Sequence, residues 1–326
     1  MTGLMHSLTA HKLPPLMMNS EQTIPAKAWA LLFLLAIIWG GSFLLIKKGL
    51  LAYTATEVAA LRIAAAGLVL APFVLHRLRH LRASHWPKLV CVGLVGSLIP
   101  AFMFALAQTQ INSGVTGVLN AFTPLAALSL GVLFFKQSLN RRQVIGLIIG
   151  LCGSTLLITA SASGALTVNS YALLVIVATI CYGLNLNLIK HHISDLHPIT
   201  ITGVSLLIVS LPAVVYLFAG TDFLAHTETS QGTLSLVAIL FLGIVGTAAA
   251  LVIFNHLVQL TNTVFTSSVT YLIPIVAMLL GVLDGEPFWL QHGLGMVTIL
   301  AGVWIANKRA RSGLAGHPER ESETSN

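Results

Sequence analysis

One arginine, Arg62, lies inside an otherwise apolar stretch, EVAALRIAAAGLVL. A guanidinium is permanently charged and offers five N–H donors in a planar fork that fits a carboxylate. A charge in an apolar segment needs a partner or water, and such residues commonly belong to binding sites. We expect Arg62 to meet Asn120 and to bind the carboxylate of a small molecule. The alternative is that Arg62 only joins two helices.

Two prolines interrupt apolar segments that resemble each other, FTPLAALSLGVLFFK around Pro124 and LIPIVAMLLGVLDGE around Pro274. Each proline removes one backbone N–H and clashes with the carbonyl four residues earlier, at Asn120 and at Thr270. In a lipid environment, a carbonyl freed in this way must be satisfied by protein, water or ligand. We therefore interpret the two prolines as parts of a binding-site wall. A packing kink is the alternative.

Other aromatic and polar side chains lie in comparable positions. The pairs Trp39–Gly40 and Tyr182–Gly183 fall near the middle of their segments, where they can line a cavity or pack in the core. The candidate substrate-binding residues are Trp39, Ser42, Arg62, Asn120, Pro124, Tyr182, Asn185, Tyr271 and Pro274, with Asn187 and Asn255 as further candidates. Glu57 and His256 are the candidates for proton coupling. Facilitated diffusion without coupling is the alternative.

The composition shows which elements must hold these residues. Of the 326 residues, 56% are hydrophobic and 8% are charged, and the mean hydropathy is +0.89. A soluble domain carries about 25% charged residues, so the sequence predicts an all-α integral membrane protein. A spanning helix needs about 20 apolar residues. We expect ten transmembrane helices, near residues 28–46, 55–75, 88–107, 113–135, 142–160, 169–189, 198–219, 233–257, 263–283 and 288–307.

The basic residues predict the orientation of these helices, because Lys and Arg in short loops favour the cytoplasmic side. They gather in the loops after the second and fourth helices and at the end of the last helix: Arg77, Arg79, Arg82, Lys88, Lys136, Arg141, Arg142, Lys308, Arg309 and Arg311. By parity, all three places lie on the same side as the N-terminus. We therefore expect residues 1–27 to form a cytoplasmic N-terminal segment and residues 308–326 a disordered cytoplasmic tail.

The sequence also repeats itself. A shift of 150 residues places Phe104 on Phe254 and Pro124 on Pro274, and a shift of 143 places WGGSFLLIK on YGLNLNLIK. The first five helices, at 28–160, thus recur as the last five, at 161–307. An odd number of crossings makes the second unit enter the membrane from the opposite side. We therefore expect two inverted-topology five-helix repeats around a midplane cavity.

Two further features follow the repeat. A shift of 149 places Gly146 on Gly295 and Gly153 on Gly302, in the fifth and tenth helices. Small residues at such spacing predict close helix packing, either inside the bundle or between two protomers, so a homodimer remains open. Lys47 and Lys190 match at opposite faces and are expected to extend to the lipid headgroups. Contact with an anionic ligand is the alternative.

The motifs in this order resemble the drug/metabolite transporter (DMT) superfamily and, within it, the EamA-type family with two EamA repeats. They are WGGSF, EVAALR and the segments of the type GVTGVLNAFTPLAALSLGVL. The resemblance implies a secondary transporter of the cell inner (plasma) membrane that exports or exchanges small metabolites, most often amino acids or their derivatives. Export of cationic drugs or other metabolites is the alternative. The family often has an acidic residue after the fourth helix. Here Lys136 takes that place, whereas the second repeat keeps Glu286.

Other classes of protein find less support. A membrane enzyme would need a recognisable cluster of catalytic groups, and the nearest cluster, KHHISDLH from Lys190 to His197, is interpreted as a solvated loop. A channel would need a filter loop or a ring of charge. We therefore expect no enzymatic activity, no cofactor, no metal and no nucleic-acid partner. The expected partners are a small-molecule substrate and the lipid bilayer. The substrate, the direction of net flux and the coupling ion remain open.

Overall fold

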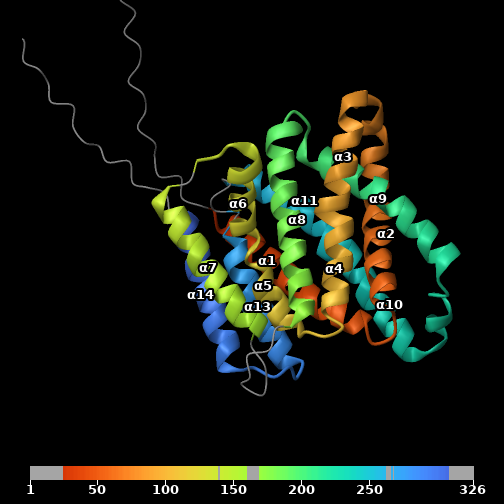
Figure 1. Ribbon diagram of the computed structural model, residues 1–326. Coiled ribbons are helices and arrows are strands. Elements are labelled where there is room, and N and C mark those ends of the chain that lie inside the picture. Colours follow the sequence, from red (N-terminus) through yellow and green to blue (C-terminus); the bar gives the residue numbers. More distant parts are fainter. Residues whose placement is uncertain (1–24, 139, 160–168, 262–265, 267, 308–326) are drawn as a thin grey trace, which may run out of the picture.

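The computed structural model describes residues 25–138, 140–159, 169–261, 266 and 268–307. Figure 1 shows a bundle of helices in which α2, α8 and the rod formed by α3 and α4 run side by side. Almost all of the predicted N-terminal segment and the whole predicted tail 308–326 lie outside the described residues. The described part contains helices and turns and no strand, as the all-α prediction requires.

Each of the ten predicted segments overlaps a described helix. The first half contains α1 (Ala26–Gly49), α2 (Ala55–Val74), α3 (Trp86–Gly93), α4 (Ile99–Ala107), α5 (Ser113–Asn120), α6 (Thr123–Phe135) and α7 (Arg141–Thr159). The second contains α8 (Ser170–His192), α9 (Pro198–Gly220), α10 (Ser230–Gly243), α11 (Ala250–Leu260), α13 (Val269–Leu283) and α14 (Leu290–Asn307). Short turns η1 (Leu75–His80), η2 (Ala83–His85) and η4 (Ala225–Glu228) precede or follow them.

Two π-helical segments interrupt the third and eighth predicted helices. The segment η3 (Leu94–Leu98) joins α3 to α4, and η5 (Ile244–Ala249) joins α10 to α11. They begin 150 residues apart, the same shift that relates the two halves of the sequence. Such bulges are rare in helices and occur frequently at functional sites.

The lengths and surfaces of the helices suit a bilayer. Within the described residues, seven helices are long and apolar enough to cross a membrane, and α13 and part of α14 are shorter apolar helices. Large apolar side chains are widely exposed on the surface, among them Phe73 at 63%, Leu133 at 73% and Phe218 at 68%. A contiguous apolar surface of this kind is unstable in water and stable in lipid.

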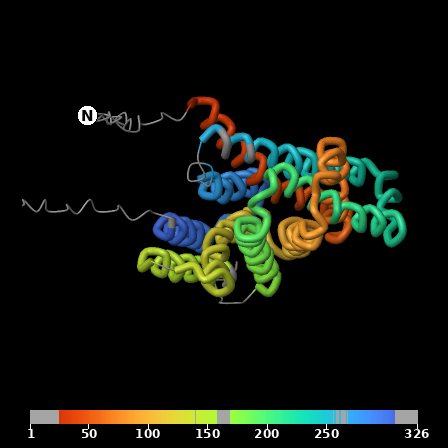
Figure 2. The backbone as a smooth tube through the Cα atoms, turned by 90° about the horizontal axis from the view of Figure 1, so that it is seen from above, coloured from red at the N-terminus to blue at the C-terminus, as the bar shows by residue number. Residues whose placement is uncertain are grey.

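The main helix contacts come in corresponding pairs. When each helix is replaced by its counterpart in the other half of the chain, a contact of the first half becomes a contact of the second. Helix α1 packs on α13, and its counterpart α8 packs on α6. Helix α2 packs on its own counterpart α9, and α7 packs on its own counterpart α14. Figure 2, which looks down on the bundle, shows α7 and α14 side by side at one edge, as does Figure 1.

The contact between α7 and α14 uses the glycines that the sequence pattern singled out. A methyl group on Gly146 would lie 2.5 Å from the carbonyl oxygen of Gly302, and one on Gly153 would lie 3.0 Å from that of Gly295. The backbones therefore approach more closely than any side chain allows. These faces are confirmed as packing surfaces inside the bundle, where they join the two halves of the chain.

Candidate functional site

Arg62 lies in the middle of α2 and reaches across to a π-helical segment. Its Nε donates a hydrogen bond to Thr247 Oγ1 at 3.1 Å, in η5. Thr247 Oγ1 in turn donates to the carbonyl oxygen of Leu242 at 3.3 Å, five residues earlier. A methyl group on Gly243 would lie 2.7 Å from the Arg62 carbonyl oxygen, so α10 and α2 are in close backbone contact here. The guanidinium is thus held by one neutral partner.

The rest of the guanidinium is not fully enclosed by protein. The Arg62 Nη groups and the Tyr182 hydroxyl have no hydrogen-bond partner among the described residues, and both side chains keep some accessible surface although they lie between helices. Arg62 and Tyr182, from α2 and α8, are close enough to interact electrostatically. The Nη groups and the hydroxyl are therefore not engaged by any described group in this conformation.

Aromatic rings from the two halves of the chain pack in two related pairs. Trp39 packs on Phe254 with ring centroids 5.5 Å apart, and Tyr182 packs on Phe104 at 5.9 Å. Phe104 also contacts Phe43 at 5.6 Å. The shifts of 143 and 150 residues that relate Trp39 to Tyr182 and Phe104 to Phe254 thus relate one pair to the other. One pair includes Tyr182, the residue that lies close to Arg62.

A second polar position lies one helical turn from Tyr182. Asn185 packs against η3, where a methyl group on Gly96 would lie 2.7 Å from its Cγ. Asn185 Oδ1 is buried and accepts no hydrogen bond within the described structure, and the same holds for Ser205 Oγ on α9. A buried acceptor without a donor costs free energy, so such atoms commonly serve a ligand or an ordered water.

The break at Pro124 differs from the prediction. Helix α5 ends at Asn120 and α6 begins at Thr123, and Thr123 Oγ1 donates to the Asn120 carbonyl oxygen at 2.8 Å. Of the three partners that the sequence left open for this carbonyl, namely protein, water or ligand, the structure shows protein, because a nearby hydroxyl satisfies it. The structure gives Arg62 a hydrogen bond to Thr247 and not to Asn120. Pro274 is buried within a continuous α13.

The remaining candidates fall at several places. Ser42 Oγ donates to the Ile38 carbonyl oxygen within α1, close to Gly246 of η5. The Tyr271 hydroxyl donates to the Val303 carbonyl oxygen of α14, at 3.3 Å. Asn187 Nδ2 donates to the carbonyl oxygens of Ala127 and Gly183, at 2.8 and 2.9 Å. Tyr271 and Asn187 therefore join helices in this conformation. The side chain of Asn255 lies outside what the structure describes.

The two titratable candidates have different surroundings. Glu57 is buried and completes a capping box at the start of α2, where its Oε2 accepts from the backbone N–H and the hydroxyl of Thr54, each at 2.9 Å. His226 Nε2 lies 3.5 Å from the same oxygen. His256 is exposed on α11. Glu57 is thus engaged in local structure, and His256 lies on the surface of the bundle.

Lys47 does not extend freely to the headgroups. Its Nζ lies 2.8 Å from Asp284 Oδ2 and 3.0 Å from Glu286 Oε1. Glu286 also accepts hydrogen bonds from the Ser113 amide and hydroxyl, at 2.9 and 2.8 Å, and from the Gly114 amide at 3.0 Å. The expected snorkelling of Lys47 is wrong, because two carboxylates lie within reach of its ammonium group. The ends of α1 and α13 and the start of α5 are joined here.

Comparing the loop around Glu286 with the loop around Lys136, at the opposite face, corrects the assignment of Lys136. Lys136 and Gly285 both adopt a left-handed backbone, with φ of 54° and 83°. The next residues, Gln137 and Glu286, each donate their amide N–H back to a glycine carbonyl, at Gly131 and Gly281. Gln137 is therefore the structural counterpart of Glu286. The sequence comparison was displaced by one residue, because the shift changes from 150 to 149 in this loop.

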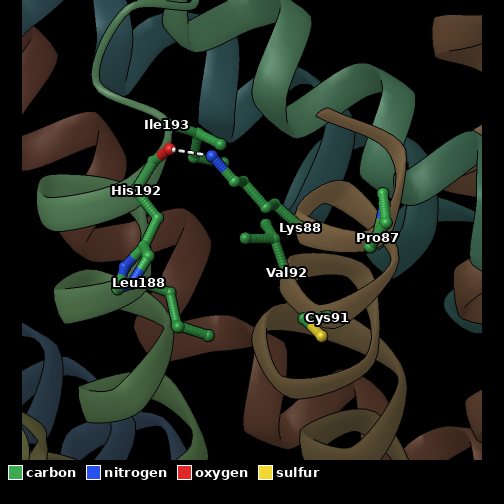
Figure 3. A pocket seen from close by; sticks show the side chains of 7 residues that line it. All are labelled: Pro87, Lys88, Cys91, Val92, Leu188, His192 and Ile193. Carbon is green, nitrogen blue, oxygen red and sulfur yellow. Dashed lines mark hydrogen bonds between the residues drawn. The ribbon is translucent and has the colours of Figure 1, made fainter. Parts of the chain in front are cut away.

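A surface hollow between the start of α3 and the end of α8 is separate from Arg62 and its neighbours. Figure 3 shows its lining residues Pro87, Lys88, Cys91, Val92, Leu188, His192 and Ile193. Lys88 Nζ donates to the His192 carbonyl oxygen at 2.9 Å and joins α3 to the end of α8. The hollow includes none of the polar residues around Arg62, so it is not assigned to the candidate site.

Sequence reasoning missed two groups that the structure brings to the site. Thr247 holds Arg62, and Phe254 and Phe104 contact Trp39 and Tyr182. A signal for Thr247 is present in the sequence. The stretch GLVGS that enters η3 recurs as GIVGT at η5, shifted by 150 residues. A small hydroxyl residue at matching positions of two apolar helices could have indicated it.

Comparison with known proteins supports the same family. The model of the EamA-like transporter family matches residues 26–159 and again residues 169–308. An inner membrane transporter of Escherichia coli (strain K12), YedA, is 28% identical over 89% of this chain and 89% of its own length. A protein of Archaeoglobus fulgidus described as an uncharacterized transporter is 26% identical over 87% of this chain and 99% of its own.

Two further similarities add detail. A probable amino-acid metabolite efflux pump of Salmonella typhimurium (strain LT2) is 25% identical over 84% of this chain and 93% of its own length. A solved crystal structure superposes with a TM-score of 0.58 at 18% identity and covers 86% of this chain and 95% of its own. It shows a shared fold. With two family matches that together cover most of the sequence, this chain is a multi-pass membrane protein of the EamA-like transporter family.

Proposed function

We propose that this protein is a secondary transporter of the inner membrane that exports or exchanges amino acids or their derivatives by alternating access. The single observation that carries the proposal is Arg62. It lies in the centre of the bundle, is held by one neutral hydrogen bond to Thr247, and has free Nη donors beside Tyr182. The similarity to the Salmonella typhimurium efflux pump supports this substrate class.

We propose ten spanning helices, arranged as two inverted repeats of five at 28–160 and 161–307, with both termini in the cytoplasm. The two separate family matches support two repeats, and the exchange of α1–α13 for α8–α6 supports a twofold relation between them. A structure that looks similar from both faces can present one central site to either side in turn.

The charge of the site favours a carboxylate over a cation. In the described helices, Arg62 is the one Lys, Arg, Asp or Glu that lies away from the helix ends. At an effective dielectric constant of about 20, two like charges about 4 Å apart repel by about 4 kcal/mol. A cationic drug would therefore meet repulsion at this position, whereas a carboxylate would form charge-assisted hydrogen bonds.

Counterflow in proteoliposomes tests the proposal, with a panel of amino acids and cationic drugs and with or without a pH gradient. We expect exchange of a labelled amino acid. Arg62→Ala should lower the transport kcat/KM about tenfold or more, because a charge-assisted hydrogen bond is lost. Arg62→Lys should retain part of the wild-type kcat/KM, since lysine keeps the positive charge but lacks the planar, forked donors of the guanidinium.

The matched control is Arg79→Ala, because Arg79 is exposed in η1 and has no described partner. It should transport at the wild-type rate. Thermal stability of all variants shows whether they fold. Wild-type transport by a folded Arg62→Ala protein would refute the assignment of Arg62, and exchange of cationic drugs in place of amino acids would refute the substrate class.

A further inference from the structure

The two faces of the bundle are joined by different chemistry. At the face formed by the α1–α2 and α13–α14 loops, Lys47 binds Asp284 and Glu286, and Lys48 Nζ also binds Asp284. Under the proposed orientation this is the external face. We use the name external latch for Lys47, Asp284, Glu286, Ser113 and Gly114. The latch joins three separate elements, α1, α5 and the α13–α14 loop.

The groups of the latch are charged and partly shielded from water. Glu286 is 8% exposed, and the side chains of Asp284 and Lys47 are 17% and 33% exposed. Burial raises the pKa of Glu286, but hydrogen bonds from Gly114, Ser113 and Lys47 outweigh it and hold the pKa below its ordinary value. The pKa of Asp284 is lowered by its hydrogen bonds to Lys47 and Lys48. Both carboxylates are therefore ionised at neutral pH.

The corresponding position at the opposite face is neutral. Gln137 replaces Glu286, and its Nε2 lies 3.2 Å from Asn187 Oδ1 and 3.1 Å from His191 Nε2. Lys190, which the repeat matches to Lys47, is exposed and forms no ion pair within the described residues. The backbone geometry is the same on both faces, so the difference lies in the side chains.

From this asymmetry we infer that Glu286 and Lys47 hold the external face of the transporter closed, and that Glu286 is the positioning residue that sets how readily this face opens. The inference rests on the proposed function for its orientation and for the meaning of opening. To admit substrate from outside, the end of α1 must separate from the α13–α14 loop and from the start of α5. Each separation breaks a charge-assisted hydrogen bond of Glu286.

The internal face has an ion pair of its own, His85 Nε2 with Asp195 Oδ2 at 3.1 Å, but the Asp195 side chain is 57% exposed. An exposed pair of this kind stabilises a contact little, and it lies away from the position that corresponds to the latch. Within the described residues, the internal counterpart has neutral hydrogen bonds between Gln137, Asn187 and His191. The external face therefore opens less readily than the internal face. Such a bias changes the populations of the two conformations without any contact between Glu286 and the substrate.

Thiol labelling tests the latch directly. Thr116 lies in α5 one turn after Ser113, is fully buried, and can be replaced by a cysteine of similar size. In a protein whose native Cys91, Cys152 and Cys181 are changed to Ser, the Thr116→Cys thiol is reacted with a membrane-impermeant reagent. Adding Glu286→Gln or Lys47→Gln should raise labelling from outside about threefold to tenfold, because a partly shielded ionic contact is lost.

Lys47→Gln guards against a folding defect, because it leaves Glu286 in place to accept from the α5 amides. Hydrogen exchange at the Ser113 and Gly114 amides, which donate to Glu286, should rise by a similar factor. Glu228→Gln is the matched control, since Glu228 is an exposed carboxylate at the same face with no described partner. It should leave labelling unchanged.

Three results would overturn the inference. These are unchanged labelling and hydrogen exchange in both latch variants, an equal rise in Glu228→Gln, and a rise only for reagent added from the cytoplasmic side. No substrate is present in these experiments. A wrong substrate class would therefore appear in the counterflow assay and leave the labelling result intact, so the two proposals fail separately.

Discussion

At the scale of single residues, Arg62 illustrates how a charge inside a bundle of apolar helices can be held without a carboxylate partner. One neutral hydrogen bond, from Nε to Thr247, fixes the guanidinium, while the described structure supplies no carboxylate to neutralise it. A carboxylate partner would compete with an anionic substrate. A neutral hydroxyl positions the fork and leaves its charge available.

Asn185 is the residue that we expect to recognise the other end of an amino acid. Its Oδ1 is a buried acceptor without a donor, one turn from Tyr182. We predict that Asn185→Leu lowers counterflow of an amino acid about tenfold, because a hydrogen bond to a charged ammonium contributes about 1.5–3 kcal/mol. Counterflow of the corresponding α-hydroxy acid, which lacks the ammonium, should change little.

The α-hydroxy acid serves as the internal control, since it shares the carboxylate and the side chain. If Asn185→Leu lowers transport of both compounds equally, Asn185 only supports the packing of α8 against η3, and the assigned role is wrong.

At the scale of the elements, the two prolines affect their helices differently, although each occupies the same place in its repeat. Before Pro124 the helix breaks, with a turn at residues 121–122, and the Thr123 hydroxyl satisfies the Asn120 carbonyl. The position that corresponds to Thr123 is Ile273, which has no hydroxyl, and α13 continues through Pro274. The neighbouring residue, as well as the proline, decides the form of the break.

The glycine contact between α7 and α14 gives a prediction about stability. In Gly146→Ala, the new methyl group would lie 2.5 Å from the Gly302 carbonyl oxygen and 2.7 Å from the Ala306 nitrogen. Overpacking of this kind costs about 1–3 kcal/mol, so the detergent-solubilised protein should unfold several degrees lower in a thermal melt. Gly293→Ala in α14 is the control, because its methyl group would contact only Phe288, at 3.2 Å. Equal losses in both variants would contradict the interpretation.

Because Gln137 is neutral, a charged residue at this position should add an ionic contact to the internal face. By the twofold relation, Gln137→Glu places a carboxylate beside Lys190 as Glu286 lies beside Lys47. We expect counterflow to slow about threefold or more, because the position that corresponds to Glu286 then has an ionic contact to break as well. Adding Lys190→Gln should restore the rate. If the slow rate persists in the double variant, Gln137 acts through Asn187 or His191 instead.

At the scale of the whole molecule, the two family matches divide the chain into two halves, and many of the main helix contacts join one half to the other. Pairs that lie far apart in sequence, such as α1 with α13 and α2 with α9, form the main contacts. In two of the contacts between the halves, α2–α9 and α7–α14, a helix packs against its own counterpart from the other half. Close approach at these contacts uses glycines in both cases, since Gly67 packs against Ser210 and Gly146 against Gly302.

An inverted arrangement predicts where the ends of each half lie. A reporter fused after residue 160 should lie in the periplasm, because five segments have crossed, whereas one fused after residue 326 should lie in the cytoplasm. Alkaline phosphatase, which is active only outside, should therefore be active in the first fusion and inactive in the second, and a fluorescent reporter should give the reverse. Activity of both fusions on the same side would contradict the two repeats.

The sequence alone determined the features that depend on local composition. Apolar length predicted where helices form, since each expected segment overlaps a described helix. Residue identities at fixed shifts predicted which parts correspond, and the glycine spacing predicted the α7–α14 contact. Arg62 and Tyr182 were recognised as candidates because a charge and an aromatic hydroxyl are conspicuous in apolar helices. Such signals are contained within one helix and need no knowledge of its neighbours.

Only the tertiary structure decided which of these side chains meet. Arg62 and Thr247 are 185 residues apart, and Lys47 lies beside Glu286 because α1 packs on α13. A one-residue change in loop length made Gln137 the counterpart of Glu286, which two left-handed residues reveal. Hydrogen bonds form within about 3 Å, whereas a sequence pattern places a side chain only to within a helical turn. The partners are therefore determined by the packing of the helices.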